Sequence, residues 1–217
     1  MSKKRIFRKK EDGIRFSLGT LVLILFCTFL LIVSTFVSLE VYYPAIPSAQ
    51  ADANGLSIKD FFKLFTIIPQ IPAVIFVGAL LGRKFAITSV IFYILIGLFL
   101  FPVFALGGGW KYIFNYGFGY ILAYIPAVWV LGMMLKDGFN IKNIALGVLY
   151  SVLTIHILGF IYMLTGALIK DEGWLFIKGW LIHQSGIKIF FDYILSFTLV
   201  YGTKLLKPFI WCYKKPY

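Results

Sequence analysis

Apolar residues in this chain gather into long, nearly continuous runs that are separated by short polar breaks. Six runs stand out, at residues 17–39, 60–82, 85–100, 119–135, 143–168 and 186–206. A helix that crosses the hydrocarbon core of a bilayer needs about 20 mostly apolar residues. The pattern therefore predicts an all-α integral membrane protein, in which residues 17–206 form a six-helix domain between basic tails at 1–16 and 207–217.

Three of the polar breaks are long enough to form loops, and each has a distinct composition. Residues 40–57 are polar and contain prolines, and residues 101–118 are too rich in glycine for a regular helix. Residues 170–184 carry two acidic residues and an amphipathic patch at Trp174–Trp180. We expect the second of these loops, rich in glycine and aromatic residues, to lie on the outer side.

The first run, Ser17–Leu39, follows a basic stretch and so resembles a secretory signal. Ala49-Gln50-Ala51 also matches a cleavage pattern. However, the run is longer than the roughly 7–15 apolar residues of a signal core, and the match lies well beyond its end. We interpret the run as an uncleaved helix.

Composition excludes an ordinary soluble domain. Of the 217 residues, 60% are hydrophobic and 14% are charged, whereas soluble domains carry about 25% charged residues. The apolar runs must therefore be covered by lipid or by other helices.

The formal net charge of +12 is concentrated beside the predicted helices. With both termini placed inside, 15 of the 21 basic residues fall in the inner loops and tails. The other six are Lys59, Lys63, Lys111, Lys170, Lys178 and Lys188. This asymmetry favours cytoplasmic termini. A nucleic-acid partner is not indicated, because no segment is long and polar enough to fold a basic face.

Reactive side chains are few and scattered. Cys27 and Cys212 lie near opposite ends of the chain, and His156 and His183 are far apart in sequence. Their spacing matches neither a metal site nor a Ser-His-Asp order. The sequence also lacks a phosphate-binding P-loop motif. We therefore expect no metal, no cofactor, no catalysis and no ATP hydrolysis by this chain.

One segment combines the properties of a ligand pocket. Gly107, Gly108 and Gly109 let the backbone turn and approach a ligand closely. Aromatic walls and polar donors would be supplied by the residues around these glycines: Phe104, Trp110, Lys111, Tyr112, Asn115, Tyr116 and Tyr120. Such a mixture suits a mostly apolar small molecule held by a few polar groups. The alternative is an interfacial belt of aromatic residues over a loop.

Asp192 is the only acidic residue inside an apolar run, and Lys188 precedes it by one helical turn on the same face. Ionisable groups within membrane helices are costly and face a partner or a cavity. The sequence leaves two interpretations open for Asp192: a role in ligand binding or transport, or a structural pair with Lys188.

The segment Phe101–Gly109, followed by Phe118–Ala127, resembles the signature of the BioY family. That signature joins a Pro-Val-Phe and Gly-rich stretch to a helix that opens with Gly-Tyr. His156–Tyr162 is similar to the fifth helix of the family, and the similarity extends from about Pro69 to Tyr162.

The resemblance implies a six-helix S component, the substrate-binding subunit of an energy-coupling-factor (ECF) vitamin transporter, in a bacterial-type plasma membrane. It implies biotin as the ligand, bound at the outer face, and a T component and ABC-type ATPase subunits as partners. The substrate-binding residues would be Phe104, Gly107, Gly108, Gly109, Lys111, Asn115, Tyr116, Tyr120, Lys188 and Asp192.

The last predicted helix departs from the family pattern Pro-Gly-Asp-x-x-Lys. Aligned on Gly186, the Asp of the pattern falls on Ile187 and its Lys on Phe190. Lys188 and Asp192 could replace them from neighbouring turns, or the ligand could differ.

The first helix lacks the Ala-x-x-x-Ala motif by which the family docks its membrane partner. Two alternatives therefore stay open: an S component for another small vitamin, and a non-transporting membrane scaffold.

Overall fold

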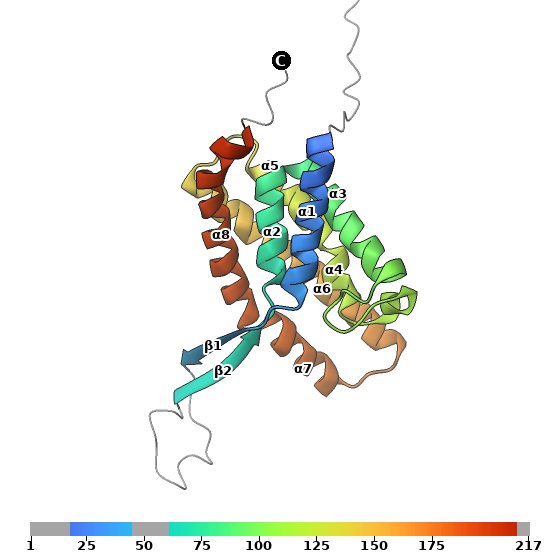
Figure 1. Cartoon of the computed structure of the whole chain (residues 1–217). Helices are drawn as coiled ribbons and strands as arrows, with labels where there is room; N and C mark the ends of the chain where they lie inside the picture. Colours follow the sequence, from blue (N-terminus) through green and yellow to red (C-terminus); the bar gives the residue numbers. More distant parts are fainter. Residues whose placement is uncertain (1–17, 45–60, 212–217) are drawn as a thin grey trace, which may run out of the picture.

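The structure, a computed structural model, describes residues 18–44 and 61–211, with side chains as far as residue 203. It is mostly helical (Figure 1). The elements are α1 (Leu18–Thr35), β1 (Leu39–Pro44), β2 (Phe62–Ile67), α2 (Gln70–Leu81), α3 (Arg83–Leu95), the π-helix η3 (Ile96–Leu100), the 3-10 helix η4 (Trp110–Phe114), α4 (Phe118–Leu122), α5 (Tyr124–Met134), α6 (Ile141–Ile169), α7 (Trp174–Ser185) and α8 (Lys188–Trp211). The expected tail at 1–16 and most of that at 207–217 lie outside the described residues, as does Ala49–Ala51.

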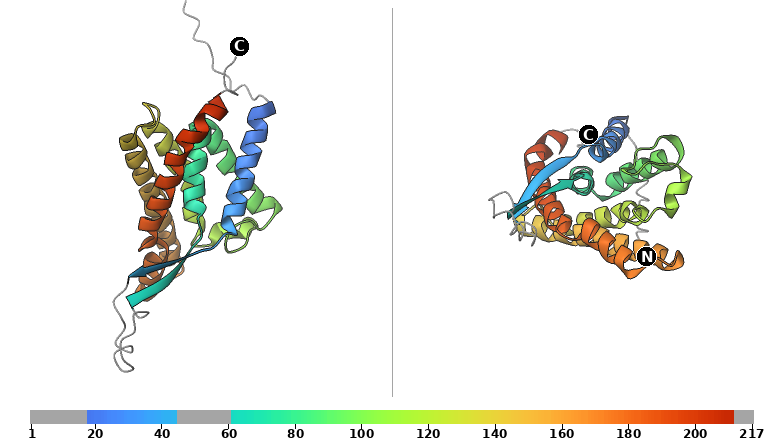
Figure 2. Two further views of the ribbon diagram at one scale, coloured as in Figure 1. Left: turned by 60° about the vertical axis from the view of Figure 1, so that its left-hand side comes forward. Right: turned by 90° about the horizontal axis from the view of Figure 1, so that it is seen from below.

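The main helical segments alternate in direction along one bundle. α1, α2, α3 with η3, α4 with α5, α6 and α8 run up and down in turn, so that the start of α1 and the end of α8 lie at the same end (Figure 1). The β1–β2 hairpin and α7 lie at the opposite end, where α7 crosses beneath the bundle (Figure 2). We call this the hairpin end.

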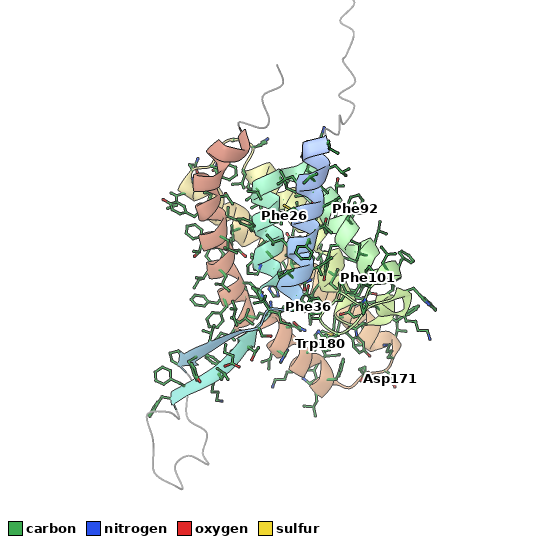
Figure 3. All side chains as sticks on the ribbon, viewed as in Figure 1. Phe26, Phe36, Phe92, Phe101, Asp171 and Trp180 are labelled. Atoms are coloured by element: carbon green, nitrogen blue, oxygen red, sulfur yellow. The ribbon has the colours of Figure 1, made fainter. Side chains whose placement is uncertain are left out.

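Apolar side chains cover the outside of the bundle as well as its core. Phe26 on α1 is 60% exposed, and Phe101 after η3 is 66% exposed (Figure 3). Within the described residues, α1 and α6 are the helices long and apolar enough to cross a bilayer, while α2 and the α4–α5 pair are shorter apolar helices. An exterior of this kind needs lipid or protein against it.

The helices approach one another closely through small and hydroxyl residues. Ser89 on α3 donates to the Ile24 carbonyl of α1 (3.2 Å), and Ser151 on α6 donates to the Ala127 carbonyl of α5 (3.0 Å). Side-chain hydroxyls of this kind commonly join membrane helices. They tie α3 to α1 and α6 to α5.

Aromatic rings seated on glycines make the tightest contacts. The Phe104 ring lies against Gly97, the Tyr162 ring against Gly119, and the Tyr120 ring against Gly159. A Cβ on any of these glycines would overlap the ring that faces it. These three contacts fix the Gly-rich loop on η3 and fix α4 on α6.

The structure differs from the sequence prediction at two elements. Residues 39–44 and 62–67 pair as an antiparallel hairpin, Leu39 opposite Ile67, where a loop and the start of a helix were expected. The second strand reads Phe-Lys-Leu-Phe-Thr-Ile, which is as apolar as a helix end, but four of its six residues are the aromatic and β-branched types that favour a strand. The expected loop at 170–184 contains α7, because its amphipathic patch packs Ile177 onto Met163 and Ala167 of α6.

Candidate ligand-binding site

A cavity of about 220 Å³ lies at the hairpin end of the bundle. Its lining comes from nearly every element that meets there: Phe65, Thr66, Ile68, Gln70, Ile71, Ala105, Leu106, Tyr112, Gly117, Tyr120, Ile121, Tyr124, His183, Gln184 and Lys188. Small-molecule sites usually measure roughly 300–1,000 Å³, so this cavity suits a compact ligand. Its lining mixes apolar side chains with hydroxyl, amide, imidazole and ammonium groups.

One wall of the cavity is held by a buried amide. Gln70 opens α2, and its Nε2 donates to Thr35 Oγ1 at the end of α1 (3.1 Å) and to the Tyr93 hydroxyl of α3. Three helices thus meet at this side chain. Because its two amide hydrogens are engaged, the orientation of the Gln70 side chain is set before any ligand arrives.

The opposite wall is formed by the β-hairpin and α8. The Phe65 ring of β2 stacks on Phe191 of α8, with ring centroids 6.1 Å apart. This contact brings Phe65 over the start of α8, where Lys188 reaches the same cavity.

A chain of polar contacts runs from the cavity into the core. Lys188 Nζ lies 2.6 Å from Asp192 Oδ2, and the same oxygen lies 3.2 Å from His156 Nε2. His156 Nδ1 contacts Ser185 Oγ (3.0 Å), which in turn contacts the Tyr120 hydroxyl (3.1 Å). Two cavity residues, Lys188 and Tyr120, are therefore joined through three residues behind them.

Within this row of polar contacts, the buried Asp192 carboxylate is paired with a lysine that remains partly exposed. The Asp192 side chain is fully buried, whereas that of Lys188 keeps 14% exposure toward the cavity. Asp192 Oδ2 accepts from Lys188 and His156, and Oδ1 has no hydrogen-bond partner among the described residues. An ammonium group has three donors, so Lys188 can bind an acidic ligand while keeping Asp192.

The Gly-rich loop contributes its tip to the cavity. Gly107 and Gly109 have positive φ angles of 118° and 88°, and Phe104 and Gly107 exchange backbone hydrogen bonds of 2.9 Å. Gly108 lies against Pro102 and Gly97, where a Cβ would come within 2.5 Å of the Pro102 backbone. The three glycines therefore fold and seat the loop, and its Ala105 and Leu106 line the cavity.

Tyr112 supplies a phenol at the cavity wall. Burial raises the pKa of Tyr112 above its usual value, while a hydrogen bond with the backbone of Leu106 lowers it by less. The phenol therefore stays protonated at physiological pH. Its hydrogen bond with the Leu106 backbone stabilises the tip of the Gly-rich loop.

The sequence analysis expected Tyr116, Tyr120 and Lys188 to line one cavity, and the structure unites only Tyr120 and Lys188 there. Tyr116 donates instead to Glu172 Oε1 (2.7 Å) and packs against Trp180 of α7. Partial burial, followed by this hydrogen bond to Glu172, raises the pKa of Tyr116. The Tyr116 ring borders a separate hollow along the end of α6.

The other sequence candidates lie around the cavity rather than in its wall. Phe104 is 2% exposed behind the loop, and Asn115 caps the Gly117 amide at 2.8 Å. Lys111 is exposed and lies over the Trp110 ring, 5.9 Å from its centroid. Asp192 lies behind Lys188.

Sequence reasoning overlooked His156, Ser185 and Gln70. His156 and Asp192 are 36 positions apart, and only the packing of α6 against α8 brings them together. Gln70 had a signal that could have been used: it is a lone amide inside an apolar run, next to two prolines.

Three comparisons with known proteins bear on this geometry. The model of the BioY family matches residues 8–206. The probable biotin transporter BioY of Lysinibacillus sphaericus is 36% identical over 112 residues, which cover 48% of this chain and 57% of that protein. The aligned part thus spans a little over half of that relative.

A solved structure extends the likeness to most of the fold. It is the crystal structure of the S-component for biotin from an ECF-type ABC transporter, which matches with a TM-score of 0.61. The match covers 89% of this chain and 95% of that one at 21% identity. The arrangement of the helices is therefore shared.

Proposed function

The chain belongs to the BioY family, whose model covers nearly its whole length, and from this premise we propose that it binds biotin for uptake across a membrane. It acts as the substrate-binding S component of an ECF-type transporter. The observation that carries the proposal is the cavity at the hairpin end, which combines apolar walls with one accessible ammonium group, that of Lys188.

Biotin presents the chemistry that this cavity complements. It is a compact fused bicycle with a ureido group at one end and a single carboxylate on an apolar chain. Lys188 is the group to bind the carboxylate, because a charge-assisted hydrogen bond is roughly twice as strong as a neutral one. Phe65, Ile71 and Leu106 offer apolar surface to the rings and chain.

Asp192 has a positioning role in this proposal. The family pattern has its Asp and Lys three residues apart. Here Lys188 and Asp192 are four residues apart, so their side chains lie on the same face of α8 and form an ion pair. Asp192 lies behind Lys188 and holds the ammonium group toward the cavity. A ligand carboxylate then meets a cation that is already oriented.

The membrane orientation is part of the proposal. The six alternating segments cross the bilayer, with both chain ends in the cytoplasm and the cavity facing outward in a bacterial-type plasma membrane. Two observations support it: the antiparallel order of the segments (Figure 1) and the charge asymmetry of the sequence, in which 15 of the 21 basic residues fall in the tails and in the loops expected inside.

Energy for uptake comes from partner subunits. The sequence contains no P-loop motif, so a T component and ABC-type ATPase subunits supply the driving force. The role of this chain is capture and transport rather than catalysis.

Titration calorimetry of the purified, folded protein tests the proposal. Biotin should bind with a nanomolar dissociation constant, equivalent to about −12 kcal/mol. Biotinamide, which lacks the negative charge, should bind at least about tenfold more weakly, since one charge-assisted bond of 1.5–3 kcal/mol is lost.

Two results would redirect the proposal. If another small vitamin binds and biotin does not, the chain is an S component for that vitamin. If neither biotin nor other vitamins produce heat with folded protein, the scaffold interpretation replaces transport.

A further inference from the structure

A further hollow lies at the end of the bundle that carries the described start of α1 and the end of α8, opposite the ligand cavity. It measures about 370 Å³ and opens between the α2–α3 turn and the end of α5. Three cations line it, together with apolar and glycine residues: Arg83, Lys84, Lys136, Leu81, Gly82, Phe85 and Gly132.

The three cations have no acidic partner in the part of the chain that the structure describes. The ion pairs recorded there are those of Asp192 with Lys188 and with His156. Asp137 follows Lys136 in the chain but is exposed and pairs with none of the three. Like charges that line one hollow repel each other, and a bound anion relieves that repulsion.

The start of α3 adds a second attraction for an anion. α3 begins at Arg83, has no acidic residue in its first turn, and is preceded by Gly82, which offers no side-chain cap. The positive end of the helix dipole therefore faces two cations, Arg83 and Lys84, instead of the carboxylate that normally stabilises it. Backbone amides at a helix start are suited to phosphate oxygens.

The hollow is built by close packing of two helices. A Cβ on Gly132 of α5 would lie 2.7 Å from the Cβ of Arg83, so the stem of Arg83 runs directly against α5. Glycine at 132 thereby lets Arg83, which opens α3, and Lys136, which follows α5, face the same space.

We propose that this hollow binds the phosphate group of an anionic phospholipid in the cytoplasmic leaflet. The inference rests on the membrane orientation proposed above and is independent of biotin binding. The hollow opens at one end of a bundle whose outer side chains are apolar, which is the level of the lipid headgroups. Basic pockets between helices on the cytoplasmic side are typical sites for such headgroups.

Native mass spectrometry of the full-length protein tests the site. The protein is incubated with equal amounts of phosphatidylglycerol and phosphatidylcholine, and the lipids that remain bound are compared. The test variant is Arg83→Gln/Lys136→Gln, in which Gln keeps the Cβ and Cγ that pack on Gly132. The control is Lys63→Gln/Lys178→Gln, which removes the same charge from exposed residues at the hairpin end.

Phosphatidylglycerol should be retained in preference to phosphatidylcholine by the native protein and by the control. The test variant should lose roughly thirtyfold in retention, from two cations near the membrane surface that each contribute about 1 kcal/mol. Arg83→Lys keeps the charge and should retain the lipid, which separates loss of the site from loss of the fold.

Three outcomes would overturn the proposal. They are equal retention of both lipids, equal losses in the test variant and the control, and displacement of the lipid by inorganic phosphate alone. The last would assign the hollow to a soluble phosphate.

Discussion

Lys188 and Asp192 form an ion pair on adjacent turns of α8, with Nζ 2.6 Å from Oδ2, and only the lysine reaches the ligand cavity. The carboxylate is fully buried and also contacts His156. The pair therefore combines a buried anchor with an accessible cation, and its two members should respond differently to mutation.

Lys188→Ala should weaken biotin binding by about tenfold or more, because a charge-assisted hydrogen bond is worth about 1.5–3 kcal/mol. Calorimetry at one temperature measures the change. Lys178→Ala is the matched control, since Lys178 is an exposed lysine of α7 away from the cavity. Equal affinities of the native protein and Lys188→Ala would remove Lys188 from the site.

Asp192→Asn should reduce the free energy of unfolding by about 3 kcal/mol or more, because it leaves a partly buried ammonium group without its counter-charge. Thermal or denaturant unfolding in detergent, with the ligand absent, measures the loss. Asp171→Asn is the control, because Asp171 is exposed and has a φ of 55°, which Asn also tolerates. If both variants unfold alike, the buried pair does not contribute to stability.

Gly159→Ala should disturb the cavity without touching it. The new Cβ would lie 2.5 Å from Tyr120 ring carbons, so the ring must move and its hydroxyl must leave Ser185. Overpacking of this kind costs about 1–3 kcal/mol of stability, and biotin affinity should fall with it. Unfolding and calorimetry on the same sample record both effects.

Gly166→Ala, two turns further along α6, is the control for that variant. Its Cβ would lie at ordinary contact distance from Tyr116, 3.4 Å, and alanine favours a helix by about 1 kcal/mol over glycine. Native-like binding by Gly159→Ala would show that Tyr120 is not needed in its present position.

Cysteine labelling of intact cells tests the orientation. In a background without Cys27 and Cys212, a membrane-impermeant reagent should label Asp171→Cys at the hairpin end and leave Asp137→Cys unlabelled. Ser57→Cys should also react, although Ser57 lies outside the described residues. Labelling of Asp137→Cys from outside would contradict the proposed membrane orientation.

The hydrophobic runs predicted the helical segments, because long apolar runs are easily distinguished in a sequence from the short polar breaks between them. The hairpin was missed since Phe62–Ile67 is apolar enough to be read as the start of a helix. Its partner, Leu39–Pro44, was assigned to a loop because two strands separated by a long connection leave no local turn signal. Pairing of this kind depends on tertiary contact.

The site was predictable only where its contacts are local. The spacing of Lys188 and Asp192 predicts that they meet, and they do. His156 and Ser185 join them through the packing of different helices, which a single sequence does not encode as a pattern. Tyr116 had the right residue type in the right segment, but Glu172 and Trp180 draw it to α7.

The three rings seated on glycines limit how this protein can move. Each ring fits because the residue opposite it is a glycine: Phe104 faces Gly97, Tyr162 faces Gly119 and Tyr120 faces Gly159. If one helix slid past another by a turn, a ring would overlap the side chain that replaces the glycine opposite it. Packed interfaces of this kind have discrete arrangements and do not deform continuously. The contacts of Tyr162 and Tyr120 therefore hold α4 and α6 together as one unit, and a change of conformation has to occur at the boundaries between this unit and its neighbours.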